Sequence, residues 1–288
     1  MKNNSPFFAK PPSDSIPLED CNFYYVQDIP GLSEPTKGHF DLRKNVNEFL
    51  GHVDFKNKTV LELGPASGFL TFHIEKIGGD VTSIELDYKK NPRGDTAPNI
   101  GDNWKSTTKD SAGNTVHTLF QDGKVENAYW YAHKAFNSKS KLILSHVNDL
   151  PAELGIYDIS LICTVLLHTQ NPFLAIKNML RHTKEKAVIA EPGGYTRIKS
   201  LHNTIRNLIR KIIALPDPPS MVYLPRPGKK NPFVWWKLSP EIISNMASTL
   251  GFEKNTITYH KQILDGRDTW YFTVVCERTV PIENCNYD

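Results

Sequence analysis

The sequence of 288 residues predicts an α/β fold with a doubly wound, mostly parallel sheet that ends in an antiparallel β-hairpin. Between residues 58 and 190, short apolar segments rich in β-branched residues alternate with amphipathic segments, a pattern typical of parallel strands joined by helices. Near the end of the chain, two β-rich segments flank Asp265-Gly266-Arg267-Asp268, which is a hairpin signal. Together these patterns indicate a sheet that is parallel at its centre and antiparallel at one edge.

The expected elements follow one another in a regular order. The spacing of apolar residues predicts helices over 42–53, 69–77, 126–136 and 172–182. It predicts parallel strands over 58–63, 81–86, 141–147, 156–167 and 186–190. Ser239-Pro240 predicts the start of a last helix that ends at Gly251, because serine caps helices and proline suits their first turn. The strands of the hairpin are expected over 256–264 and 269–277.

The composition is that of an ordinary globular protein and excludes several classes. With 39% hydrophobic and 23% charged residues, the chain can bury a sizeable core and is not predicted to be disordered. Its net charge of +3 is too small to indicate nucleic-acid binding by itself. Four cysteines lie far apart and predict neither a disulfide framework nor a metal site: Cys21, Cys163, Cys276 and Cys285.

No targeting or membrane segment is expected. The first 18 residues contain no apolar segment, so we expect no signal peptide. The longest apolar run, residues 159–167, is too short to cross a bilayer. These features predict a cytoplasmic protein without a membrane span.

The chain is expected to form one domain with a cap. Residues 42–280 would form the domain, with insertions at 88–125 and 197–238, and residues 281–288 a tail. Residues 1–41 are expected to form an N-terminal arm and lid, because aromatic residues stand among turn residues in their second half. The insertion at 88–125 is polar and could contact a substrate or form a homodimer contact.

The second insertion contains a segment with a distinct pattern. Residues 197–215 have the spacing of a basic amphipathic helix, which could contact anionic lipid or RNA. The same pattern suits a lid or dimer helix with a solvated basic face. We favour the lid.

The segment most informative about chemistry is Glu62-Leu-Gly64-Pro-Ala66-Ser-Gly68, which joins a strand to a helix. Glycines allow a sharp turn and close approach of a ligand, and the helix N-terminus adds N–H donors. Glu62 could accept a hydrogen bond from an ammonium group. Glu85, at the end of the second strand, is placed to bind both hydroxyls of a ribose.

The same segment has two other interpretations. A βαβ unit without a nucleotide would use the glycines only for tight turns. A dinucleotide site would require G-x-G-x-x-G, whereas Ala66 and Phe69 occupy the second and third glycine positions here. The spacing therefore fits a nicotinamide or flavin site poorly.

These residues resemble the first motif of class I S-adenosylmethionine-dependent methyltransferases, E/D-x-G-x-G-x-G, with Ala66 in place of the middle glycine. The resemblance covers about residues 42–278 and includes the terminal hairpin. It implies a Rossmann-like fold and S-adenosylmethionine as cofactor, with Glu62 facing the methionine part and Glu85 the ribose. The turn from Gly64 through Ala66 to Gly68 would face the cofactor backbone.

The resemblance extends to the next two strands. Residues 147–151 look like the adenine-side loop of the family, so Asn148 or Asp149 would reach the adenine amino group, although either could instead form an ordinary Asx turn. Thr164, at the end of the fourth strand, is a further candidate cofactor contact.

Two titratable residues follow the central strands, at the edge of the sheet where ligands bind in this fold class. His168 is the first candidate for a general base toward a hydroxyl acceptor, and Glu191 is the second. A histidine that caps the following helix and an ordinary loop glutamate are the alternatives.

Segments around Tyr25, Arg43 and Trp235 resemble one branch of the family, the group around the tRNA wobble-uridine carboxymethyltransferase. In that branch the N-terminal segment and the insertion after strand five cover the active site. The resemblance makes these three residues candidate substrate contacts, and packing of the aromatic residues into a satellite core is the alternative.

The sequence therefore predicts an S-adenosylmethionine-dependent methyltransferase acting on a small-molecule acceptor. A tRNA-modifying methyltransferase or carboxymethyltransferase is the second hypothesis. A non-catalytic S-adenosylmethionine-binding protein is the third.

Overall fold

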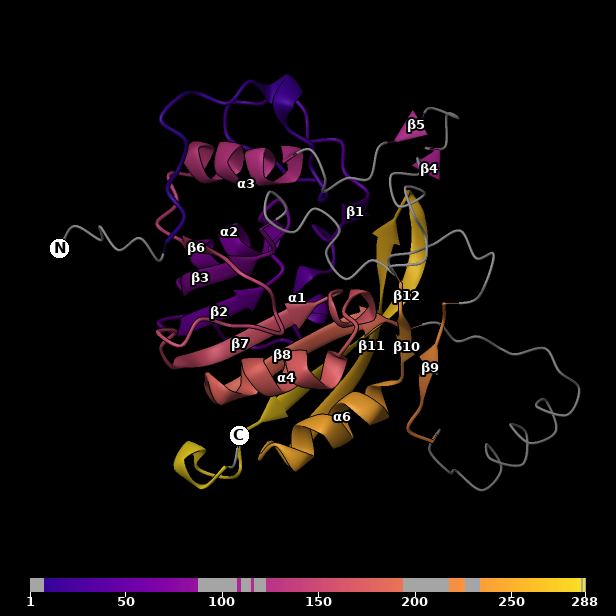
Figure 1. Cartoon of the computed structure of the whole chain (residues 1–288). Coiled ribbons are helices and arrows are strands. Elements are labelled where there is room, and N and C mark those ends of the chain that lie inside the picture. Colours follow the sequence, from indigo (N-terminus) through magenta and orange to yellow (C-terminus); the bar gives the residue numbers. More distant parts are fainter. Residues whose placement is uncertain are drawn as a thin grey trace, which may run out of the picture.

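The computed structural model describes residues 8–87, 108–109, 115–116, 123–193, 218–225, 234–285 and 287. The helix predicted over 197–215 lies outside these residues, as does most of the insertion at 88–125. Within the described part, eight strands form one sheet in the order β1-β11-β12-β8-β7-β2-β3-β6 (Figure 1).

Five parallel strands form the centre of this sheet and confirm the predicted doubly wound architecture. They are β2 (Thr59–Leu63), β3 (Asp80–Glu85), β6 (Lys141–Leu144), β7 (Tyr157–Cys163) and β8 (Thr183–Pro192). Across the sheet these strands lie in the order β6-β3-β2-β7-β8. The chain adds β3 and β6 on one side of β2 and then adds β7 and β8 on the other side, so the switch point lies between β2 and β7. The loops at the carboxyl ends of β2 and β7 therefore flank the switch point, where ligands bind in open α/β sheets.

The predicted hairpin is present and extends the sheet with β11 (Lys254–Leu264) and β12 (Arg267–Glu277). Strand β12 pairs antiparallel with β8, and the short β1 (Phe40–Asp41) pairs antiparallel with β11. The turn contains two residues rather than the predicted four. Asp265 and Gly266 have φ angles of 49° and 72°, the left-handed backbone of a tight turn that follows the twist of the strands.

Helices cover both faces of the sheet. They are α1 (Val46–Phe49), α2 (Phe69–Lys76), α3 (Lys124–Ala135), α4 (Pro172–Arg181) and α6 (Pro240–Thr249). The predicted cap of the last helix is confirmed, since Ser239 accepts a hydrogen bond from the N–H of Ile242 and Pro240 follows it. Asn171 and Pro172 start α4 in the same way.

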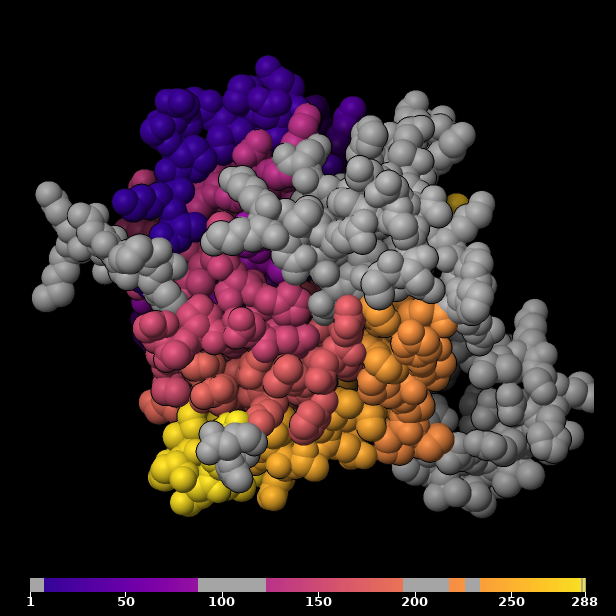
Figure 2. Space-filling view, viewed as in Figure 1, coloured from indigo at the N-terminus to yellow at the C-terminus, as the bar shows by residue number. Residues whose placement is uncertain are grey.

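Two large apolar clusters form the core, one on each face. Residues of α4 and α6, such as Met179 and Ile243, pack with the sheet on one face. On the other face, residues of α1 and α2 pack with Tyr25 and Phe40 from the N-terminal segment. This segment also lies along α3, where Phe23 joins a third cluster (Figure 2).

Short elements complete the described chain. Strands β4 (Thr108–Lys109) and β5 (Thr115–Val116) pair with each other, as do β9 (Met221–Tyr223) and β10 (Trp236–Leu238). Single helical turns are η1 (Leu18–Asp20), η3 (Leu166–His168) and η4 (Ile282–Asn284). No helix in the described ranges has the length and apolar character needed to cross a membrane.

Two predicted boundaries are wrong for identifiable reasons. The helix expected over 42–53 is only Val46–Phe49, because the Asp41 carboxylate accepts the N–H of Arg43 and holds a local turn there. The strand expected over 156–167 ends at Cys163, because Thr164 has a left-handed backbone with a φ of 56°.

Candidate functional site

Two loops flank the switch point and lie in contact with each other. We call residues 64–68, which follow β2, the first loop, and residues 164–168, which follow β7, the second loop. A Cβ atom added to Gly64 would stand 2.4 Å from Cγ2 of Val165, so the backbone of the first loop approaches the second loop as closely as a glycine allows.

The first loop is built on left-handed backbone. Gly64, Ala66 and Gly68 have φ angles of 81°, 49° and 84°. Ala66 adopts this conformation without glycine, and its side chain is 8% exposed and joins the apolar cluster of the α2 face. The methyl group that replaces the expected glycine therefore packs into the core.

Glu85 fixes the first loop from the neighbouring strand. Its Oε2 atom accepts the N–H of Ala66 at 2.9 Å, and its Oε1 atom accepts the N–H of Leu86 at 2.9 Å. Burial raises the pKa of the carboxyl group to about 7, although the two backbone hydrogen bonds oppose this rise. Each carboxylate oxygen can still accept a second hydrogen bond, so the group remains able to bind hydroxyls.

Glu62 lies deeper, in the core between β2, β3 and α2. The hydroxyls of Thr71 and Ser83 both donate to its Oε2 atom, the second at 2.9 Å. Neither bond uses Oε1. Burial raises the pKa of Glu62 to about 7, since these hydroxyl bonds offset only part of the cost of ionisation.

The residues predicted for the adenine side differ in their surroundings. Asn148 donates from Nδ2 to Oγ1 of Thr169 at 2.8 Å, which places it beside the end of the second loop. Its Oδ1 atom is buried and has no hydrogen-bond partner among the described residues. Asp149 is exposed, and its backbone N–H closes a turn on the carbonyl of His146.

Glu191 stands inside β8 rather than in the loop after it, and it is 2% exposed. Its Oε1 atom accepts the N–H of Leu166 at 2.8 Å, and the N–H groups of Val165 and Leu167 also stabilise the carboxylate. Burial outweighs these bonds and raises the pKa of Glu191 to about 8. The geometry therefore makes Glu191 an anchor of the second loop.

His168 and Trp235 lie together at this loop. His168 is exposed within η3, and its backbone N–H donates to the carbonyl of Val165 at 2.9 Å. The N–H of Trp235 donates to the carbonyl of Leu167 at 2.8 Å, and Nε1 of Trp236 donates to the carbonyl of Thr169 at 3.0 Å. The start of strand β10 therefore packs against the end of the second loop.

The other two predicted substrate contacts have structural partners. Tyr25 is 2% exposed and stacks on Phe40, with the rings tilted by 22° and their centroids 5.8 Å apart. Arg43 donates to Asp41 and Asp28, which raises the pKa of its guanidinium above the ordinary value. Arg43 is thus paired with these carboxylates, and its role as a substrate contact stays a prediction.

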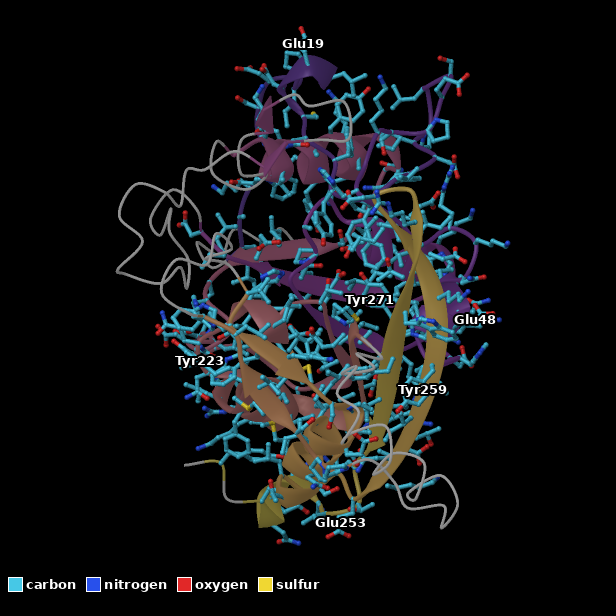
Figure 3. The ribbon with its side chains drawn as sticks, turned by 90° about the vertical axis from the view of Figure 1, so that its right-hand side faces the viewer. Glu19, Glu48, Tyr223, Glu253, Tyr259 and Tyr271 are labelled. Atoms are coloured by element: carbon cyan, nitrogen blue, oxygen red, sulfur yellow. The ribbon has the colours of Figure 1, made fainter. Side chains whose placement is uncertain are left out.

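Sequence reasoning missed a group of side chains that gather at the second loop. Burial raises the pKa of the Tyr24 hydroxyl to about 12, with Asp265 and Glu191 adding to the rise and the nearby side chain of Thr164 opposing it. Burial also raises the pKa of Tyr271, and Asp265 and Glu191 again contribute. Figure 3 shows Tyr271 on the part of the hairpin nearer the N-terminal segment.

A histidine–carboxylate pair adjoins this group. Nδ1 of His39 lies 2.7 Å from Oδ1 of Asp265, in the turn of the hairpin. The alternation of aromatic and turn residues in the N-terminal segment signalled a cover. No local pattern signalled that Asp265, more than 200 residues away, would meet it.

Comparison with known proteins gives structural matches only. No family model matches the chain, and no curated protein matches its sequence. The N-terminal domain of EvdMO1, solved in the presence of SAH and D-fucose, is similar over 90% of this chain and 93% of that chain, with 15% identity and a TM-score of 0.51.

Two methyltransferases are similar at lower scores. Magnesium protoporphyrin IX methyltransferase (ChlM) from Synechocystis PCC 6803, with bound SAH, has 12% identity and a TM-score of 0.45 over 80% of this chain and 78% of that chain. The 1,6-didemethyltoxoflavin-N1-methyltransferase of Burkholderia thailandensis has 10% identity and a TM-score of 0.49 over 82% and 78%.

At these identities the likeness concerns the fold. The chain has a Rossmann-like fold with a mostly parallel sheet and a terminal antiparallel hairpin, and solved structures similar to it include S-adenosylmethionine-dependent methyltransferases.

Proposed function

We propose that the chain is an S-adenosylmethionine-dependent methyltransferase that acts on a small-molecule acceptor. The observation that carries the proposal is the pairing of Glu85 with the first loop at the switch point. A carboxylate that already holds the N–H of Ala66 stands where a ribose would meet the turn. The EvdMO1 domain, which shares the fold, was solved in the presence of SAH, and this supports the choice of donor.

The donor set of the site fits this cofactor. Oδ1 of Asn148 is a buried acceptor without a partner in the described chain, and the adenine amino group is the donor it lacks. Glu85 can accept from ribose hydroxyls, and Oε1 of Glu62 would face the ammonium group of the methionine part. Asp149 is exposed and contributes its backbone, so we favour Asn148 for adenine.

S-adenosylmethionine supplies an electrophilic methyl group on a positively charged sulfonium. Acidic side chains near the site would favour binding of this cation, and basic side chains would oppose it. Glu62, Glu85 and Glu191 all lie at or beside the two loops. When ionised, Glu62 and Glu85 would attract this cation and repel the extra negative charge of a carboxymethyl donor, which supports a plain methyl donor.

On the acceptor side, the residues position the substrate and move its proton. Tyr24, Thr164 and Trp235 lie at the second loop and would form a polar and aromatic wall. His168 is our candidate base for a hydroxyl acceptor, because it is exposed at the carboxyl end of β7. Glu191 would act through the loop that it anchors rather than on the substrate.

Methyl-labelled S-adenosylmethionine, incubated with the protein and fractionated cell extract, tests the proposal. We expect label in small metabolites. Label in RNA, with binding that weakens steeply as salt rises, would favour the tRNA-modifying hypothesis instead. Tight SAH binding without any labelled product would favour the non-catalytic one.

Two variants make this experiment specific to the site. In Gly68→Asp, the new Cβ would stand 2.4 Å from the Phe72 ring on backbone with a φ of 84°, so SAH binding should be lost. His168→Ala should keep SAH affinity and slow transfer about 100-fold or more if the acceptor needs a base. An unchanged rate would remove His168 from the mechanism.

A further inference from the structure

The N-terminal segment makes direct hydrogen bonds to the first loop. Ser67 is fully buried, and its Oγ accepts the backbone N–H of Tyr25 at 3.1 Å. Nε2 of Gln27 donates to the carbonyl of Ser67 at 2.8 Å and reaches its Oγ at 3.1 Å. Gln27 is itself 2% exposed, so these bonds are shielded from water.

The same segment reaches the second loop. Tyr24, next to Tyr25, lies near the side chain of Thr164, which lowers the pKa of the Tyr24 hydroxyl against the effect of burial. Four consecutive residues, 24–27, therefore contact both loops that flank the switch point. We call residues 24–27 the bridge.

The bridge is held in shape by its own turn. Thr36 accepts the N–H of Gln27 at 2.8 Å and donates to the carbonyl of Tyr25 at 3.0 Å. A Cβ atom on Gly38 would stand 2.3 Å from the carbonyl carbon of Tyr25, so the returning chain passes directly against the bridge. These contacts make the bridge a preformed part of the fold.

The bond from Gln27 to the Ser67 carbonyl bears directly on the first loop. This carbonyl belongs to the peptide unit between Ser67 and Gly68, so holding it fixes the orientation of that unit. Gly68 has a φ of 84°, a value that a glycine can leave at little cost. Gln27 thus restrains the peptide unit that precedes one of the two glycines of the first loop.

We propose that Gln27 is a positioning residue for donor binding, which acts through Ser67 to hold the first loop in its binding conformation. The inference rests on the proposed function, because it takes the first loop as the S-adenosylmethionine site. The proposal assigns part of that site to the N-terminal segment, although the sequence analysis places residues 1–41 outside the domain of residues 42–280.

Gln27→Met tests the proposal, because methionine keeps the buried volume and removes both donors. Loss of the bond leaves the Ser67 carbonyl without its partner, and we expect the Kd for SAH, measured by calorimetry, to rise about tenfold. The proposal is overturned if Gln27→Met lowers the Tm but binds SAH as tightly as the unmodified protein.

Gln262→Met is the matched control. Gln262 is 3% exposed, and its Nε2 donates to the Asn45 carbonyl at 3.0 Å and reaches Nδ1 of His260 at 3.1 Å, away from both loops. We expect it to lower the Tm about as much as Gln27→Met while leaving the Kd within about twofold. Equal effects of both variants on the Kd would mean general destabilisation and would overturn the proposal.

Ser67→Ala provides a second test if Gln27→Met does not fold. It removes the hydroxyl and leaves the bond from Gln27 to the Ser67 carbonyl, so the Kd should rise about threefold. A rise of tenfold or more would mean that the hydroxyl, rather than the carbonyl that Gln27 holds, fixes the first loop, and would contradict the proposal. Absence of SAH binding by the unmodified protein would overturn the proposed function itself, whereas normal binding with unaffected variants would overturn only this inference.

Discussion

The first and second loops occupy equivalent places at the ends of β2 and β7, but they are stabilised by different means. The first loop depends on its own glycines, on Glu85 from the adjacent strand and on the bridge. The second loop depends on one buried carboxylate, Glu191, and on a backbone bond from Trp235, which precedes β10. The first loop therefore depends in part on its own glycines, whereas the second is held by residues outside it.

The contact between the loops gives the largest expected effect. In Gly64→Ala, the new methyl group would meet Val165 at 2.4 Å on backbone with a φ of 81°. We expect the Kd for SAH to rise about 100-fold or more, because both the clash and the left-handed backbone oppose the loop. Calorimetry with purified protein provides the measurement.

A second substitution separates the two causes. Val165→Ala removes the clashing methyl groups and should recover part of the affinity of Gly64→Ala, leaving only the cost of the backbone, about 1–2 kcal/mol. Val165→Ala alone should change the Kd little. If the double variant binds no better than Gly64→Ala, the two loops are not coupled through this contact.

Glu85→Gln should have the next largest effect. The amide can still accept the N–H of Ala66, but it loses the charge that strengthens bonds from ribose hydroxyls, so we expect the Kd for SAH to rise about tenfold at pH 8. Calorimetry across pH 5.5–8 makes the test more specific. Burial raises the pKa of Glu85 to about 7, so below that pH the unmodified protein must lose a proton to bind, and its affinity falls.

In Glu85→Gln this decline should be shallower, and the part that remains reports on Glu62, whose pKa is also raised to about 7. Equal slopes in both proteins would mean that Glu85 does not bind the ligand as a carboxylate.

The difference between the loops also explains what could be predicted from the sequence. The strand-turn-helix around Gly64 and Gly68, with Glu85 one strand further, is encoded in short-range spacing, so the first loop was predicted with its acidic residues. The hairpin was predicted because Asp265-Gly266 is a strong local signal. Both depend on residues close together in the chain.

The second loop could be predicted only in part. His168 was identified because it follows a buried strand, but Glu191 was assigned to a loop, whereas β8 continues past it to pair with β12. Pairing with a distant strand, rather than local propensity, sets that boundary. Tyr24 and Gln27 were missed because their partners, Thr164 and Ser67, lie 140 and 40 residues away.

The smallest expected effect concerns the anchor of the second loop. Burial raises the pKa of Glu191 from its ordinary value of 4.5 to about 8, so the folded protein prefers the protonated form. The stability contributed by this group is complete below pH 4.5 and is lost as the pH rises through 8. The side chain of Glu191→Gln stays neutral throughout. The Tm of this variant, relative to that of the unmodified protein, should therefore increase by on the order of 5 °C between pH 5 and pH 8.5.

Glu48→Gln, on the exposed surface of α1 (Figure 3), is the control and should show a constant difference in Tm over the same range. A constant difference for Glu191→Gln as well would mean that Glu191 is ionised in the fold. The second loop would then be anchored by a charge-assisted bond, as the Glu85 carboxylate anchors the first loop above pH 7. A difference that grows with pH would instead mean that the two loops are held by opposite protonation states near neutral pH.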